Sequence, residues 1–121
     1  MAKLQNEPKA ADLQLTAVLY ALSDEVRLRI VRSLDQTDEI ACGYFDIDMP
    51  KSSLSHHFRV LRTAGVVTAR KEGTALMNRL RRADLDTKFP GLLDSVLASM
   101  GKRKKPKSKP QSRSTAANLA N

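Results

Sequence analysis

Short hydroxyl, imidazole and guanidinium side chains between residues 51 and 63 are the part of the sequence best suited to chemistry. On a helix with about 100° between residues, Leu54, Phe58 and Leu61 fall within about 60° of one another and would face a core. The polar side chains then point the other way, where they can bond base edges and phosphates of a duplex. A merely solvated helix face is the alternative. The candidate contact residues here are Lys51, Ser52, Ser53, Ser55, His56, Arg59 and Arg62.

A second group of cations follows in two β-prone runs, residues 66–70 and 75–80, joined by four residues that include Gly73. This pattern predicts a β-hairpin. Its candidate contacts suit phosphates or a narrow minor groove. Alone they would fit a solvated turn better, but a basic hairpin directly after a polar helix face favours nucleic-acid binding. The hairpin candidates are Arg70, Lys71, Thr74 and Arg79.

The two histidines and the cysteine do not form a predicted metal site. His56 and His57 point about 100° apart on a helix, so they cannot converge on one ion. We expect His57 to be packed and hydrogen-bonded beside the core, and His56 to be exposed. Cys42, the single cysteine, is interpreted as a small buried apolar residue, with a redox or partner-binding switch as the alternative. We expect no metal and no cofactor.

Apolar spacing predicts four helices, which with the hairpin make a mainly α fold. The first helix covers residues 13–22 after an Asp12 cap, and the second begins at an Ser23 N-cap and continues to residue 34. One or two short helical turns are expected within residues 35–50. The helix over residues 51–64 ends at Gly65, and a last helix opens at Pro90 and runs to residue 100.

The chain has 121 residues, which suits one domain over residues 12–100. Residues 1–11 lack periodicity and predict a flexible N-terminus, and residues 101–121 predict a disordered basic tail. Charge is uneven: residues 51–82 hold eight basic groups against one acid, the tail holds seven against none, and the remainder is acidic. No signal peptide or membrane-spanning run is evident, so a soluble cytoplasmic protein without a membrane partner is expected.

Two segments resemble the ArsR family of regulators. ALSDEVRLRI at residues 21–30 is similar to its second helix, and KSSLSHHFRVLRTAGVV at residues 51–67 is similar to its recognition helix leading into the wing. The resemblance, over residues 13–100, implies a winged helix-turn-helix that represses by occupying a promoter and usually releases DNA on binding an effector. It also implies a homodimer held by the first and last helices, through Leu15, Leu19, Leu92, Leu93, Val96 and Leu97.

The sequence departs from the family pattern in two places. Members that sense soft metals carry a cysteine pair near the position of Cys42, whereas this chain has one cysteine, and its last helix holds no histidine. Metal sensing is therefore not expected, and a small-molecule effector of unknown identity is left open. Residues 43–50 are also shorter than the usual first helix of the family's helix-turn-helix.

No convergent acid, base and nucleophile, and no glycine-rich phosphate loop, occur in the sequence, so we do not expect an enzyme. The predicted function is a sequence-specific transcriptional regulator that binds double-stranded DNA, a repressor acting as a homodimer on a palindromic operator. The alternative is a nucleoid-type protein that coats DNA with little sequence preference through its basic tail.

Overall fold

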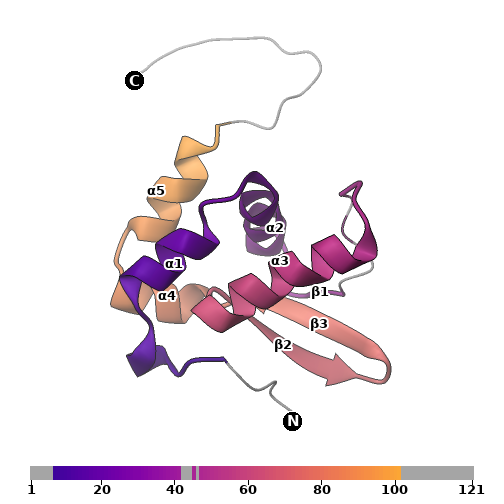
Figure 1. The fold of residues 1–121 in the computed structure, drawn as a ribbon. Helices are drawn as coiled ribbons and strands as arrows, with labels where there is room; N and C mark the ends of the chain where they lie inside the picture. Colours follow the sequence, from indigo (N-terminus) through magenta and orange to yellow (C-terminus); the bar gives the residue numbers. More distant parts are fainter. Residues whose placement is uncertain (1–6, 42–44, 46, 102–121) are drawn as a thin grey trace.

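The computed structural model describes residues 7–41, 45 and 47–101. Figure 1 shows α3 lying across a small sheet, whose hairpin of β2 and β3 points away from α1, α4 and α5. This is the winged helix-turn-helix architecture that the sequence predicts, mainly α with a small hairpin. The elements are η1 (Ala10–Asp12), α1 (Leu15–Ala21), α2 (Glu25–Asp35), β1 (Ile40–Ala41), α3 (Lys51–Ala64), β2 (Val67–Glu72), β3 (Ala75–Leu80), α4 (Arg82–Lys88) and α5 (Leu92–Ser99).

One apolar core joins all the longer elements. Val18 of α1, Ile30 of α2, Phe58 and Leu61 of α3 and Val67 of β2 are each buried within it. Removing such side chains from water is the main favourable contribution to folding, at roughly 1.5–3 kcal/mol for each large one. The inward positions of Phe58 and Leu61 confirm the predicted core face of the helix over residues 51–64.

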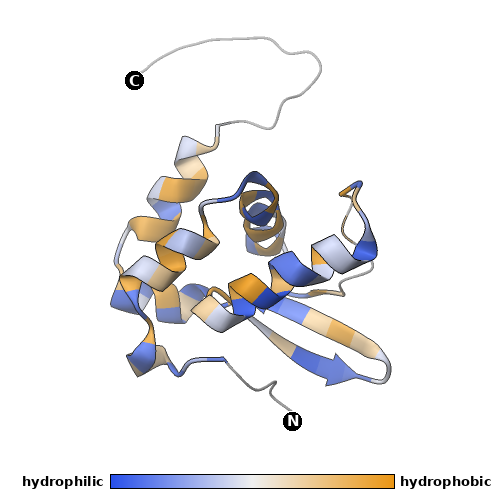
Figure 2. Ribbon diagram, viewed as in Figure 1, coloured by the Kyte–Doolittle hydropathy of each residue, from blue (hydrophilic) through white to orange (hydrophobic). Residues whose placement is uncertain are grey.

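The sheet is antiparallel, with strand order β1-β3-β2. The predicted hairpin is confirmed, although its strands are joined by two residues, because Glu72 already pairs with Ala75. Gly73 has a φ of 65°, a left-handed value that glycine adopts without a steric penalty. In Figure 2 the colour of β2 changes from apolar at its base to hydrophilic towards the hairpin tip. The two-residue strand β1 was not predicted, because its pairing with β3 is remote in sequence.

Gly65 ends α3 in the left-handed conformation, with a φ of 87°, as its predicted role as a C-cap requires. The amide of Val66 donates to the Leu61 carbonyl oxygen at 3.0 Å and so satisfies one of the last carbonyls of the helix. A Cβ atom at Gly65 would lie 2.2 Å from Cδ2 of Leu13. The end of α3 is therefore packed tightly against the N-terminal segment.

The N-terminal helices differ in detail from the prediction. Asp12 ends η1 and does not cap α1, which begins at Leu15. Asp24, and not Ser23, caps α2: its Oδ2 accepts hydrogen bonds from the amides of Val26 and Arg27 at 2.8 and 3.1 Å. The Ser23 hydroxyl instead donates to a carbonyl oxygen of the preceding turn.

Part of the predicted flexible N-terminus is bonded to the domain. Both carboxylate oxygens of Glu7 accept hydrogen bonds from β2, one from the hydroxyl of Thr68 and one from the amide of Ala69. The Pro8 carbonyl oxygen accepts from Arg81 at 2.7 Å. Residues 7 and 8 are therefore bonded to β2 and Arg81, which differs from the expectation of a flexible segment over residues 1–11.

Two further segments differ from the predicted pattern of helices. Helix α2 continues to Asp35, and the described residues 36–41, 45 and 47–50 form β1 and irregular backbone without the short helical turns expected within residues 35–50; Cys42 and its predicted burial lie outside the described residues. The predicted last helix over residues 90–100 is confirmed as α5, which begins at Leu92, whereas the preceding helix α4 was not predicted; Pro90 and the left-handed Gly91, with a φ of 82°, separate the two. Within the described ranges, no helix is both long and apolar enough to cross a bilayer.

Candidate nucleic-acid interface

The polar side of α3 is open to solvent, opposite the buried Phe58, whose side chain is 1% exposed. We define the outward face of α3 as its exposed polar residues. Ser53 and Arg62, also predicted contacts, are half-buried at the edges of this face. The outward face comprises Lys51, Ser52, Ser55, His56, Arg59 and Thr63.

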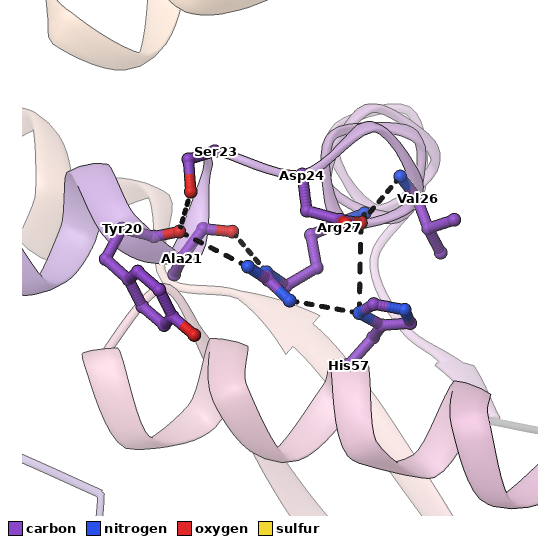
Figure 3. Close-up of polar contacts among 7 residues, drawn as sticks. All are labelled: Tyr20, Ala21, Ser23, Asp24, Val26, Arg27 and His57. Carbon is purple, nitrogen blue, oxygen red and sulfur yellow. Dashed lines mark hydrogen bonds and ion pairs between the residues drawn. The ribbon is translucent and has the colours of Figure 1, made fainter.

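The buried side chain of Arg27 links α3 to the C-terminal end of α1 (Figure 3). Arg27 of α2 donates from Nε to the Ala21 carbonyl oxygen at 2.7 Å and from Nη2 to the Tyr20 carbonyl oxygen at 3.3 Å. Its Nη1 lies 3.0 Å from Nδ1 of His57 on α3. A guanidinium only donates, so in this hydrogen bond Nδ1 of His57 is the accepting nitrogen. The expectation that His57 is packed and hydrogen-bonded is confirmed.

Asp24 completes this cluster beneath α3. Its Oδ2, which caps α2, also lies 3.8 Å from Nδ1 of His57. Burial alone would raise the pKa of the Asp24 carboxyl, but backbone hydrogen bonds and the nearby His57 and Arg27 outweigh it, and the pKa is lowered. Sequence reasoning did not assign Arg27 and Asp24 to the support of α3. The available signal was an arginine amid the apolar positions of α2, where an unpaired charge is costly.

We define the wing as the hairpin of residues 67–80. Its cations are of two kinds, paired and unpaired. Arg70 is paired with Glu39 and with Glu72, at N to O distances of 2.8 and 2.7 Å. Lys71 and Arg79 are exposed, and no carboxylate of the described residues pairs with either. Thr74, the fourth predicted wing residue, is exposed in the turn.

The last two arginines of the basic segment, residues 51–82, have structural roles. Arg81 bonds Asp84 and the N-terminal segment, and its side chain is 8% exposed. Arg82 pairs with three aspartates, which lie on α2, α4 and α5. Their charges are therefore neutralised within the domain. The unpaired cations among the described residues of this segment are Lys51, Arg59, Arg62, Lys71 and Arg79.

The predicted dimerisation residues separate into exposed and internal ones. Leu15 and Leu19 of α1 are 46% and 44% exposed, beside Tyr20 at 63%. Leu92, Val96 and Leu97 of α5 are half-buried. Leu93 is 2% exposed and belongs to the core, so its assignment to a contact between protomers is wrong.

Among the described residues, no group of three histidine, cysteine, aspartate or glutamate side chains is placed to hold a metal ion.

Comparison with known proteins identifies the family. The sequence model described as "Bacterial regulatory protein, arsR family" matches residues 24–69. The uncharacterized HTH-type transcriptional regulator YceK of Bacillus subtilis (strain 168) is 36% identical over 92 residues, which cover 73% of this chain and 92% of the relative. The chain belongs to the ArsR family. It is a transcriptional regulator with a DNA-binding helix-turn-helix.

Solved structures agree with this assignment. HlyU from Vibrio cholerae N16961 is 26% identical, with a TM-score of 0.58 over 69% of this chain and 88% of that protein. The transcriptional repressor BigR from Xylella fastidiosa is also 26% identical, with a TM-score of 0.58 over 74% of this chain and 88% of that protein. The fold of this ArsR-family regulator is a winged helix-turn-helix, in which β2 and β3 form the wing.

Proposed function

We propose that this ArsR-family regulator is a repressor that binds a palindromic operator as a homodimer, with α3 in the major groove. The outward face of α3 carries the proposal, because donors of several lengths lie on one side of a helix whose other side is fixed in the core. The major groove of B-DNA admits an α-helix and distinguishes all four base pairs.

The length of each side chain on the outward face would decide which part of the DNA it contacts. Arg59 is exposed near the middle of α3, where its guanidinium can bond the two major-groove acceptors of guanine. Ser52, Ser55 and His56 are shorter and can meet base edges or phosphates where the helix lies closest. Lys51, at the first turn, suits a phosphate. Ser53 and Arg62 would contact the backbone from the edges of the face.

The homodimer is supported by apolar side chains of α1 and α5, two helices that Figure 1 shows at the end of the molecule away from the wing. Leu15, Leu19 and Tyr20 are large and exposed, and Leu92, Val96 and Leu97 are half-buried. A second copy would remove this apolar surface from water. ArsR-family regulators usually function as dimers.

The repressor role is supported by the similarity to BigR, itself described as a transcriptional repressor. A two-fold dimer requires a two-fold operator, with half-site centres about one helical turn, roughly 10 bp, or a small multiple apart.

Selection of bound sequences from a random pool of DNA duplexes tests this function. We expect a two-fold symmetric motif with the spacing given above. An asymmetric or featureless result would contradict the palindromic operator. A ratio of motif affinity to random-DNA affinity near one would favour the nucleoid-type alternative, in which the basic tail coats DNA without reading its sequence.

A further inference from the structure

Arg70 is the most completely paired cation of the wing. Its Nε and Nη2 donate to Oε2 and Oε1 of Glu39 at 2.9 and 2.8 Å, and its Nη1 lies 2.7 Å from Oε1 of Glu72. Two parallel bonds between a guanidinium and a carboxylate fix direction as well as distance. One guanidinium with two carboxylates has a local charge of −1, so this group offers no net positive charge to a phosphate.

The pair of Glu39 and Arg70 spans the exposed face of the sheet. Arg70 and Glu72 alternate with buried positions of β2 and so lie on the outer face. Arg79 lies on that face too, because it is the register partner of Thr68. Glu39 directly precedes β1, which is separated from β2 by β3. The ion pair therefore crosses β3 and ties the base of the sheet to the wing.

The electrostatics keep this link intact at neutral pH. Hydrogen bonds from Arg70, with the nearby charge of Arg79, hold the pKa of the Glu39 carboxyl below its ordinary value, so the carboxylate stays ionised. Glu39 is also the less exposed partner, with 22% of its side chain open to water against 44% for Arg70. Separating Glu39 from Arg70 would leave the Glu39 carboxylate without its partner and would repel phosphates.

We propose that Glu39 and Arg70 form a strut that sets the angle of the wing, and that the wing meets phosphates through Lys71 and Arg79 instead. This rests on the proposed function as an operator-binding regulator. It replaces the phosphate contact that the sequence predicts for Arg70. Because the strut fixes the angle of the wing before binding, the wing loses less conformational entropy when it meets the operator. The strut carries no net positive charge, so it does not raise the affinity for random DNA.

The test compares two variants with the wild-type full chain on the selected motif and on a random duplex, across a range of salt concentrations. The double variant Glu39→Gln with Arg70→Gln removes the strut and leaves the summed charge unchanged. Arg79→Gln is the matched control, since it removes one unpaired cation from the same face. Fluorescence anisotropy gives the affinities, and circular dichroism checks folding.

We expect Arg79→Gln to flatten the slope of log affinity against log salt by about 0.9, the value for one phosphate contact. The double variant should keep the wild-type slope and random-DNA affinity, yet bind the motif roughly two- to fivefold more weakly, as the loss of a partly exposed ion pair allows. A flattened slope in the double variant would identify Arg70 as a phosphate ligand and overturn the proposal. Unchanged motif affinity, or a wild-type slope for Arg79→Gln, would overturn it too.

Glu72→Gln is a third variant, which keeps the test decisive if the double variant does not fold. It retains the strut and removes one acid, so random-DNA affinity should rise while the preferred motif remains the same. A loss of motif preference in this variant would contradict a strut made by Glu39 and Arg70 without Glu72. Failure of the wild-type protein to prefer the motif would count against the proposed function itself, which separates the two hypotheses.

Discussion

Phe58 and Arg59 are adjacent on α3 but have opposite environments, so their alanine variants should separate stability from binding. Phe58 is 1% exposed, and its ring meets that of Phe45 edge to face at a centroid distance of 4.9 Å. Truncating a buried phenylalanine costs about 3–5 kcal/mol. Because 1 kcal/mol shifts the melting temperature of a domain this size by about 4–8 °C, Phe58→Ala should lower it by at least about 12 °C.

Arg59→Ala should leave stability almost unchanged and weaken DNA binding. The side chain is exposed and has no polar partner among the described residues, so stability should change by no more than about 0.5 kcal/mol. If Arg59 contacts a base edge, motif affinity should fall by about 1–3 kcal/mol, which is roughly 5- to 150-fold. Ser55→Ala, on the same outward face, should also weaken binding without unfolding the protein.

Thermal circular dichroism and fluorescence anisotropy at one fixed salt concentration measure the two effects on the same samples. Unfolding of Arg59→Ala, or unchanged melting of Phe58→Ala, would refute the assignment of the two faces of α3. If Arg59→Ala is stable and binds the motif with wild-type affinity, the assignment of the two faces stands but Arg59 does not contact the operator.

Four further predictions concern other parts of the chain. Gly65→Ala should destabilise by about 1–3 kcal/mol in a denaturant titration because of its left-handed backbone and close packing, and more than Gly73→Ala, around which a Cβ atom meets nothing within 4 Å. Asp24→Ala should cost about 1 kcal/mol at neutral pH; since the folded pKa of this carboxyl is lowered, the wild-type advantage is complete above the unfolded value of 3.8 and should shrink as pH falls below it. Cys42→Ser should still bind the motif, and zinc or arsenite should not release DNA from the wild-type protein; metal-dependent release with a thiolate absorption band would contradict this. Truncation after Met100 should flatten the salt slope by less than about six units, given seven cations in the tail, and leave the selected motif unchanged; an altered motif would mean that the tail reads bases.

The parts of the fold that the sequence predicted well are set by local rules. The helical spacing of Phe58 and Leu61 predicted the core face of α3. Gly65 predicted its end, because glycine adopts the left-handed backbone found there without a steric penalty. The hairpin followed from β-prone runs around Gly73. The outward face of α3 could then be predicted from its buried face alone, because the opposite side of such a helix is exposed.

The parts that were missed depend on contacts remote in sequence. The short helix α4 has a polar sequence, and Arg82 at its start pairs with Asp35 and Asp94 of other helices. Charge counting treated Arg70 as a free cation because Glu39 lies 31 residues away and nothing local marks the pair. Ser23 and Asp24 are both good N-caps, and the choice between them was made by the hydroxyl of Ser23 turning back to Tyr20.

The buried guanidinium beneath α3 has a consequence for how the sequence can diverge. Arg27 reaches the carbonyl oxygens of Tyr20 and Ala21 and also Nδ1 of His57, and this uses the planar fork of its donors. A lysine would present one nitrogen in place of three and would leave acceptors unmet, and an apolar residue would leave His57 without its donor. Positions 27 and 57 are thus expected to change together among descendants of this gene, whereas the outward face of α3 can diverge one residue at a time as operators change.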